Sequence, residues 1–347
     1  MTSIKTITPK DFIFRVLSGV AIGIVAGLVP NAILGEIFKY FMDYHPIFKT
    51  LLGVVVAIQF TVPALIGALV AMKFDLSPLA IAVVASAAYV GSGAAQFKNG
   101  AWMITGIGDL INTMITAAIA VLFILLIQHR VGSMALIVFP TVVGGISGAI
   151  GVLILPYTKM ITTAIGNMVN GFTELQPIVM SILISMVFSL IIISPLSTVA
   201  IAFAIGITGL AAGSASATEA VLIIGTSKVN RLGVPLSVFF GGVKMMIPNM
   251  VKYPILMLPI LTTAIVSGLV SALVGIHGTK ESAGFGFIGM VGPINAFKFM
   301  EVDSAWLSVL LIVVAFFVVP FVTAWLADII YRKVFRLYTN DIFKFMG

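Results

Sequence analysis

The chain has 347 residues, of which 60% are hydrophobic and 9% are charged, and its mean hydropathy is +1.20. Soluble domains carry about 25% charged residues, so this composition excludes a soluble globular protein and is typical of membrane spans. The net charge of +7 fits an excess of Lys and Arg in cytoplasmic loops and tails, so no nucleic acid is expected as a partner. We therefore predict an all-α polytopic membrane protein in the lipid bilayer, with about eight to ten transmembrane helices, some of them broken or re-entrant.

The sequence offers little material for catalysis or for a metal. It contains no cysteine, which excludes a phosphocysteine intermediate and thiolate metal sites. The three histidines, His45, His129 and His277, are scattered without ligand spacing. The GxxxxGKS/T phosphate loop is missing, which excludes ATP-driven transport by this chain alone. We expect no cofactor, no metal and no reaction catalysed by this chain alone.

Cations gather near both ends of the chain. They are Lys5, Lys10 and Arg15 near the N-terminus, and Arg332, Lys333, Arg336 and Lys344 near the C-terminus. Under the positive-inside rule both termini are expected in the cytoplasm, which requires an even number of spans. The first apolar run lacks an Ala-x-Ala-like cleavage site, so we expect it to remain as a span.

The first predicted span, residues 12–30, carries three glycines at four-residue spacing. They are Gly19, Gly23 and Gly27. This spacing predicts a smooth surface on which another helix can pack closely. Residues 30–49 mix aromatic side chains with nearly balanced charges and are expected to form an extracytoplasmic loop or an interfacial helix.

The next two segments carry signals for interrupted helices. Residues 50–72 form the second predicted span, and Pro63 predicts a kink in it. The apolar run 78–90 is too short to cross ~30 Å of hydrocarbon, and it continues into the poor helix former GSGAAQFKNG. Residues 78–101 are therefore predicted as a broken helix or a re-entrant element.

Three segments complete the first half of the chain. Residues 102–127 are predicted as a span, with Asp109 and Asn112 solvated at its interfacial start. Residues 131–155 form another glycine-rich span. A proline then predicts a break, followed by an amphipathic interfacial helix over residues 156–172.

The second half follows a similar course. Residues 175–193, 259–276 and 306–330 are predicted spans. Residues 194–213 form a second short segment that ends in glycine, and the glycine-rich residues 278–297 are expected to form a loop or hairpin.

A weak internal echo relates the two halves. Ser-Pro-Leu at 77–79 returns at 194–196, and each copy leads through a short apolar segment to a small-residue turn, at 91–96 and 213–218. Paired broken helices at corresponding positions predict a two-fold repeat and a transporter-type binding site. We expect one integral membrane domain, with its parts placed as follows: first span 12–30, halves 50–172 and 173–300, last span 304–332, and no soluble domain within 1–347.

Glu219 is the first candidate for a binding residue. It is the only charged residue between Ile191 and Ser227, in a run rich in Gly, Ala and Ser. A charge at the bilayer centre costs roughly 2.5–3.5 kcal/mol, so an intramembrane acid predicts a functional site. The alternative is an acid at a helix end that is paired with Lys228 or Lys244.

Glu174 is the rival candidate. Thr173-x-x-Gln176 matches a capping box, which would place Glu174 in the first turn of the next span. The motif also follows amides at Asn167 and Asn170, which suit sugar hydroxyls. We expect Glu174 and Glu219 to approach one cavity, with Glu219 deeper.

Further candidates are polar residues in strongly apolar surroundings. Lys244 and Lys252 flank Asn249 and are placed to bind an anionic group such as a phosphate or carboxylate, unless they form part of a cytoplasmic basic turn. Gln96 is a candidate pore-lining amide, and Thr218 adjoins Glu219. The residues alone leave open a sugar permease subunit, a membrane sensor and an ion-coupled secondary transporter.

The glutamate motifs resemble those of a known family. Gly171-Phe172-Thr173-Glu174 fits the Gly-x-Thr/Ser-Glu element of the membrane IIC components of bacterial sugar phosphotransferase systems (PTS), and Ser216-Ala217-Thr218-Glu219 fits it with serine for glycine. The whole layout, including TELQP, ISPLSTVAIA and the basic tail, is similar to the IIC-like group that includes the membrane regulator of perfringolysin O.

This resemblance implies a homodimeric protein of the bacterial inner membrane that translocates or senses a sugar. In the transport case it implies separate IIA and IIB partner proteins, and the IIB partner phosphorylates the sugar. A regulator that kept the fold and lost transport would carry the same motifs. Neutral sugar, sugar acid and phosphorylated compound all remain open as substrates.

Overall fold

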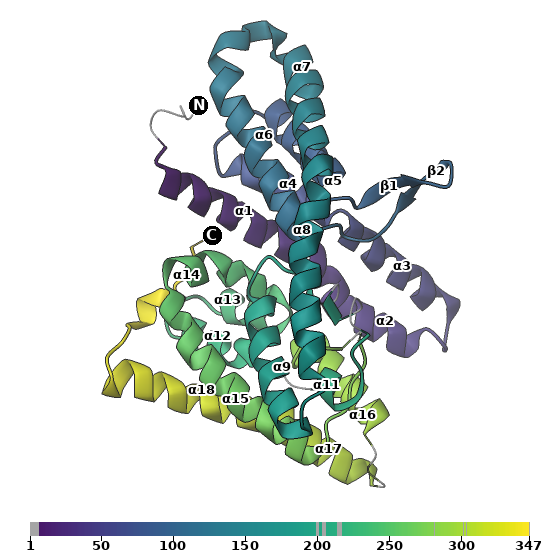
Figure 1. The fold of residues 1–347 in the computed structure, drawn as a ribbon, viewed down its shortest axis with the longest axis vertical. Coiled ribbons are helices and arrows are strands. Elements are labelled where there is room, and N and C mark those ends of the chain that lie inside the picture. The colour runs from purple at the N-terminus through teal and green to yellow at the C-terminus, as the bar shows by residue number, and fades with distance from the viewer. Residues whose placement is uncertain are drawn as a thin grey trace. The chain divides into compact units, whose positions relative to one another are not determined.

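The computed structural model describes residues 7–198, 201–202, 206–213, 217–280, 282–300, 302 and 304–346, with only the backbone of Glu36. Helices dominate these residues, which confirms the all-α polytopic class (Figure 1). Lys5 and half of the predicted 213–218 turn, residues 214–216, lie outside the described residues. Contacts divide the chain into two compact units with the boundary after Met160, and each is described by itself.

Five helical runs of the described chain are long and apolar enough to cross a membrane. They are Pro9–Phe41, Leu110–Phe172, Gly209–Thr226, Pro254–Val274 and Ala305–Val334, with the bent pair Pro46–Phe60 and Val62–Met72 as a sixth. This number is below the predicted eight to ten for two reasons. Two apolar helices have only 14 and 16 residues, and the 63-residue run contains three helices and reverses direction after the first of them, which ends at Val131 (Figure 1).

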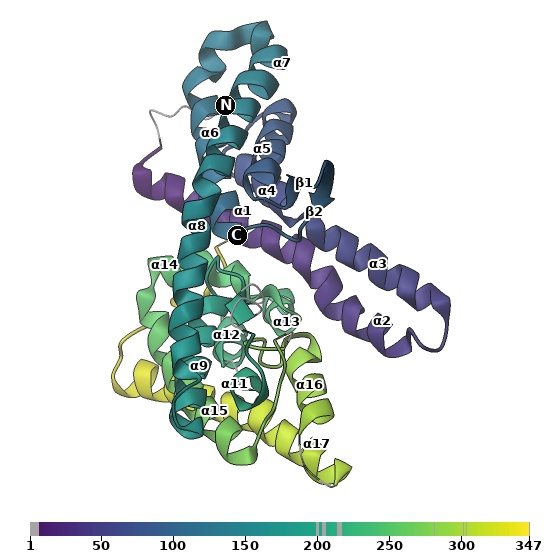
Figure 2. The ribbon, with the colours of Figure 1, turned by 45° about the vertical axis from the view of Figure 1, so that its right-hand side comes forward.

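The first unit begins with a helical hairpin. α1 (Pro9–Pro30) continues through a π-helical turn (Asn31–Gly35) into α2 (Glu36–Phe41), so residues 31–41 are helical and do not form the predicted loop. α3 (Pro46–Phe60) then runs back along α2 (Figure 2).

The glycine face of α1 packs on α4 (Val62–Met72), as its spacing predicts. A Cβ atom on Gly19 would lie 2.4 Å from the Val70 Cα atom, and one on Gly23 would lie 2.6 Å from the Ile66 Cα atom. The two backbones therefore touch, which only glycine permits. α3 and α4 are bent by 46°, which confirms the predicted kink.

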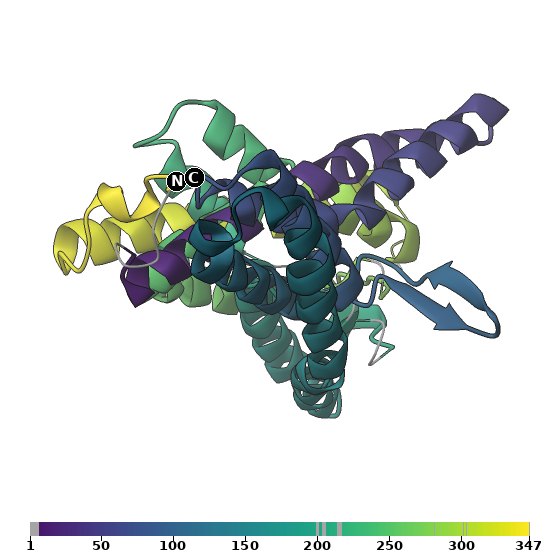
Figure 3. The ribbon, with the colours of Figure 1, turned by 90° about the horizontal axis from the view of Figure 1, so that it is seen from above.

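α5 (Pro78–Gly91) is the predicted short helix, and a β-hairpin follows it. β1 (Ala95–Lys98) and β2 (Ala101–Ile104) pair antiparallel across an Asn-Gly turn whose two residues have positive φ, as a tight hairpin requires. Figure 3 shows the hairpin extending from the helices of its own unit. The predicted span at 102–127 therefore began too early.

α6 (Leu110–Val131) starts where Asp109 accepts a hydrogen bond from the Asn112 N–H at 2.7 Å. The side chain of Asn112 is fully buried, so the expectation of interfacial solvation was wrong for it. Its amide donates to the carbonyl oxygens of Gly91 at 2.5 Å and Gly151 at 2.7 Å. One side chain thus joins α6 to the end of α5 and to the next long helix.

That long helix is α8 (Gly145–Phe172), which follows a short 3₁₀ turn (Gly132–Met134), α7 (Ala135–Val138) and a π turn (Phe139–Gly144). It runs through Pro156, so the predicted break there was wrong. Proline removes only the hydrogen bond from position 156 to the Val152 carbonyl oxygen, and both Val152 and Pro156 lie on the exposed side of α8.

The second unit contains α9 (Pro177–Ile192), α11 (Gly209–Gly213), α12 (Thr218–Thr226), α13 (Gly233–Phe239), α14 (Ile247–Lys252), α15 (Met257–Val274), α16 (Val291–Phe299), α17 (Ala305–Val313) and α18 (Val319–Asp328). Short 3₁₀ and π turns, Gly242–Met246, Pro254–Leu256, Ile288–Met290, Val314–Val318, Ile329–Val334 and Asn340–Phe343, link or extend these helices. α16 replaces part of the loop predicted at 278–297. α9 and α15 pack so closely that a Cβ atom on Gly268 would lie 2.6 Å from the Ser181 carbonyl oxygen.

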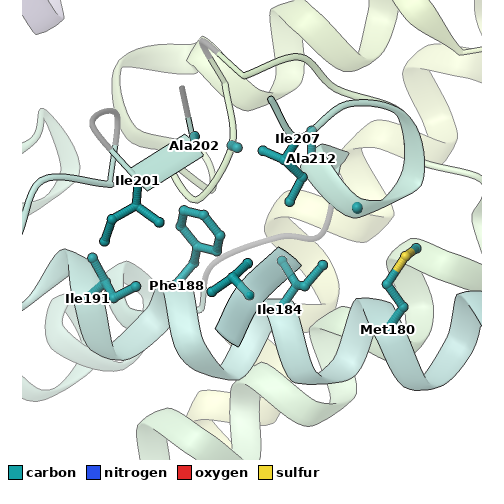
Figure 4. Close-up of a cluster of buried hydrophobic side chains, with 11 residues drawn as sticks. Met180, Ile184, Phe188, Ile191, Ile201, Ala202, Ile207 and Ala212 are labelled. Atoms are coloured by element: carbon teal, nitrogen blue, oxygen red, sulfur yellow. The ribbon is translucent and has the colours of Figure 1, made fainter. Parts of the chain in front are cut away.

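An apolar cluster lies over one face of α9 (Figure 4). Phe188 is fully buried at its centre, among Ile184, Ile191 and Ile201. Gly284, with φ +74°, lets the backbone pass the Phe188 ring, which a Cβ atom would approach to 2.0 Å. The cluster seats the short segments that lie between α9 and α12 in the sequence.

The glycine contact between α1 and α4 provides a test of the first unit. Gly23→Ala should lower the free energy of unfolding by about 1–3 kcal/mol, because the added methyl group meets Ile66 backbone atoms that cannot move alone. Gly53→Ala on α3 is the matched control, since its methyl group meets nothing within 4 Å. Thermal midpoints in detergent measure both variants, and equal midpoints would contradict the packing.

Candidate functional site

α12 carries the acid that the sequence singles out. Glu219 lies in the first turn of the helix and has no solvent-exposed surface. Thr218 before it and Ala220 after it are also fully buried. The unpaired N–H groups at a helix N-terminus favour an anion there, which offsets part of the cost of burying the carboxylate.

The N-terminus of α12 is fixed to α9 by a single serine. The Ala217 N–H donates to the Ser189 hydroxyl at 3.0 Å, and the Thr218 hydroxyl donates to the Ser189 carbonyl oxygen. Ala217 has no side chain that could cap the helix, so Ser189 supplies the cap from another helix. The predicted site residue Thr218 thereby acquires a backbone partner and holds the turn that carries Glu219.

Lys244 holds the turn that follows α9. Its ammonium group donates to the carbonyl oxygens of Ser194 at 2.5 Å and Leu196 at 2.7 Å. The residue is only 8% exposed, so its side chain is buried in the protein and not solvated. Burial lowers the pKa of this amine to about 7. A neutral amine keeps two N–H donors, which suffice for the two carbonyl groups.

Asn249 binds the C-terminal tail. Its amide donates to the carbonyl oxygens of Ile342 and Lys344, both at 2.8 Å. From the other side, Asn230 donates to the Phe343 carbonyl oxygen at 2.8 Å. The Phe343 ring fills a notch on α12 at Gly225, where a Cβ atom would lie 2.2 Å from the ring. The tail is thus bound directly to the helix that carries Glu219.

Ion pairs between side chains hold the other end of α12. Lys228 contacts the Asp328 carboxylate at 2.5 Å, and Arg332 contacts the same carboxylate at 2.9 Å. The Asp328 side chain is only 6% exposed, so these contacts are little screened by water. Lys228 and Lys244, the two cations considered as partners of Glu219, therefore have anchoring partners of their own.

The remaining candidates lie elsewhere. Glu174 and Gln176 are exposed in the turn between α8 and α9. Gln176 is itself the N-cap residue and makes no capping hydrogen bond through its side chain, so the predicted capping box was wrong. Gln96 belongs to β1 of the other unit, where its amide donates to the Gly93 carbonyl oxygen at 3.0 Å.

Two stripes of hydroxyl groups escaped the sequence reasoning. Ser181, Ser185 and Ser189 recur every four residues along α9 and are fully buried. Thr263, Ser267 and Ser271 form a similar buried stripe on α15. The four-residue spacing in MSILISMVFS was the available signal, because it places small polar side chains on one face of a helix.

The arrangement is suited to binding a polar molecule without covalent chemistry. It combines a buried carboxylate at a helix N-terminus with serine and threonine hydroxyl groups on α9 and α12. An ionised carboxylate only accepts hydrogen bonds, and the hydroxyl groups both donate and accept. Among the described residues, no three His, Cys, Asp or Glu side chains gather where they could hold a metal ion.

The fold and the buried polar site define a multi-pass, all-α membrane protein. A family model described as Phosphotransferase system, EIIC matches residues 14–345, which is nearly the whole chain. The chain therefore belongs to the PTS EIIC family, as its resemblance predicted. Searches of curated proteins and of solved structures gave no match.

The buried amine of Lys244 predicts a dependence of stability on pH. Between its folded pKa of about 7 and the ordinary value of about 10.4, the unfolded chain binds a proton that the folded chain does not, so stability rises with pH. From pH 7 to 9 the wild-type chain should gain about 2 kcal/mol relative to Lys244→Met. Thermal midpoints in detergent at each pH measure this difference, and a constant difference would contradict burial of the amine.

Proposed function

We propose that the chain is the sugar-binding and sugar-translocating membrane subunit of a phosphotransferase system. The observation that carries the proposal is the fully buried Glu219 at the N-terminus of α12, in a chain that belongs to the EIIC family. An ionised carboxylate can accept hydrogen bonds from two adjacent hydroxyl groups, so Glu219 is suited to binding a sugar.

The segments around α12 support access to Glu219. α11 has only five residues, and Gly206 and Gly209 hold left-handed φ values of 63° and 66°. Short pieces of this kind can move while the long helices α9 and α15 stay paired, because few regular hydrogen bonds are lost. We infer that the sugar reaches the carboxylate by displacement of these pieces.

We assign phosphorylation of the sugar to a separate IIB protein, which receives its phosphoryl group from IIA. The chain has no cysteine, so it cannot carry a phosphocysteine itself. We further propose a homodimer in the bacterial inner membrane, as the family resemblance implies. The basic residues near each terminus support a cytoplasmic position for both termini.

A pair of Glu→Gln variants tests the site. Glu219→Gln should weaken sugar binding about tenfold to a hundredfold, because a charge-assisted hydrogen bond contributes about 1.5–3 kcal/mol. Glu174→Gln is the matched control and should change binding less than about twofold, since this side chain is exposed. Ligand is first found by thermal-shift screening of a sugar panel and then titrated by calorimetry. Unchanged binding by a folded Glu219→Gln variant would contradict the site.

Transport is tested separately in vesicles supplied with phosphoenolpyruvate and soluble PTS proteins. Accumulation of phosphorylated sugar supports the permease. Binding without accumulation would instead assign the chain to sensing, the second function that this fold can serve. Uptake driven by an ion gradient without any phosphoryl donor would overturn both assignments.

A further inference from the structure

A cationic pocket lies where the last apolar helical run meets the C-terminal tail. It has a volume of about 500 Å³ and is lined by Arg332, Lys333, Arg336, Tyr338, Thr339 and Asn340. Arg332 is paired with Asp328, and the Thr339 hydroxyl contacts the Asp341 carboxylate at 3.2 Å. Lys333 and Arg336 form no ion pair with a described residue. The pocket therefore presents two uncompensated positive charges.

Two polar groups in the wall of this pocket lack partners. The Tyr338 hydroxyl and the Asn340 side-chain oxygen are buried, and neither has a hydrogen-bond partner among the described residues. Tyr338 is only 7% exposed, and burial raises the pKa of its phenol, so the group stays a neutral O–H donor. Buried polar groups are nearly always paired in native proteins. The Asn340 oxygen is an acceptor, so the argument for an anion rests on the Tyr338 hydroxyl, a donor in the same wall as two cations.

The backbone at Arg336 has an unfavourable conformation, which also indicates a ligand. Arg336 has φ +52°, the left-handed conformation that usually requires glycine at a helix end. The chain reverses there, with the Leu337 N–H donating to the Tyr331 carbonyl oxygen at 2.9 Å. A non-glycine residue in this conformation is destabilised, because its Cβ atom crowds the following carbonyl oxygen. An arginine at such a position supplies a cation to the pocket at the expense of local stability.

The surroundings of the pocket match a lipid better than a free ion. The apolar run Ala305–Val334 ends beside it, so the pocket adjoins a segment long enough to span the bilayer. Val334, Phe335 and Leu337 are exposed next to the cations. Apolar side chains of this kind can contact acyl chains, and Lys and Arg can contact a phosphate group at the level of the headgroups.

We propose that this pocket binds the phosphate headgroup of an anionic phospholipid, with Lys333 and Arg336 contacting the phosphate, Tyr338 donating a hydrogen bond, and Phe335 and Leu337 contacting the acyl chains. The pocket is formed by the tail that Asn230 and Asn249 bind against α12. A lipid held here would tie the tail to the bilayer. The proposal does not depend on the sugar-binding role of Glu219.

Native mass spectrometry of the purified chain in neutral detergent tests the pocket, with phosphatidylglycerol as the probe and phosphatidylcholine of the same acyl composition as the neutral control. The wild-type chain should retain one phosphatidylglycerol at least about tenfold more tightly than Arg336→Gly or Lys333→Gln, since each variant loses a charge-assisted contact. Lys344→Gln is the matched control, because it removes an exposed cation of the same tail that does not line the pocket.

Arg336→Gly keeps the test free of folding artefacts. Glycine suits the left-handed backbone at this position, so the variant should unfold at the same temperature as the wild type or higher when no lipid is present. Its loss of lipid then reports on the pocket and not on the fold.

Three results would overturn the proposal. The first is equal retention of phosphatidylglycerol by the wild type and Arg336→Gly. The second is an equal loss in Lys344→Gln, which would show attraction by the whole basic tail. The third is stabilisation by inorganic phosphate as large as that by phosphatidylglycerol, which would assign the pocket to a free phosphate instead of a lipid.

Discussion

The structure depends on side chains that satisfy backbone groups wherever a helix breaks in an apolar interior. Each unsatisfied N–H or C=O in such surroundings costs several kcal/mol, and no bulk water is present to take its place. In the first unit Asn112 serves the carbonyl groups of Gly91 and Gly151. In the second unit Ser189 caps α12, and Lys244 serves the turn after α9. Broken helices are stable here because these few buried polar side chains reach the breaks.

Close helix packing is the second requirement, and small residues provide it. The glycine face of α1 lets its backbone touch α4, and Gly268 does the same for α15 against α9. Between apolar helices in lipid, association relies on such contacts, since the hydrophobic effect no longer distinguishes protein from solvent. The serine stripe of α9 serves both requirements, because serine is small enough for close packing and carries the hydroxyl group that caps α12.

α12 is the element through which the parts of the second unit are connected. Its N-terminus carries Glu219 and rests on α9, and its C-terminal end is held through Lys228 by Asp328. The tail packs its Phe343 ring into the notch at Gly225, and the earlier part of the same tail forms the cationic pocket around Arg336. Any movement of the Glu219 turn is therefore opposed by contacts at both ends of a nine-residue helix.

The sequence by itself determined the features that rest on local pattern. Composition identified the membrane class, and Pro63 predicted the bend before α4. The spacing of Gly23 and its neighbours predicted the packing face of α1, and the length of the 78–90 run predicted the short helix α5. Only the tertiary structure decided which polar side chains are buried and which of them bind backbone groups, because this depends on segments far apart in sequence. Asn249 looked like a substrate ligand and binds the tail almost a hundred residues away. Glu174 and Glu219 carry similar motifs, and packing alone exposes the first and buries the second.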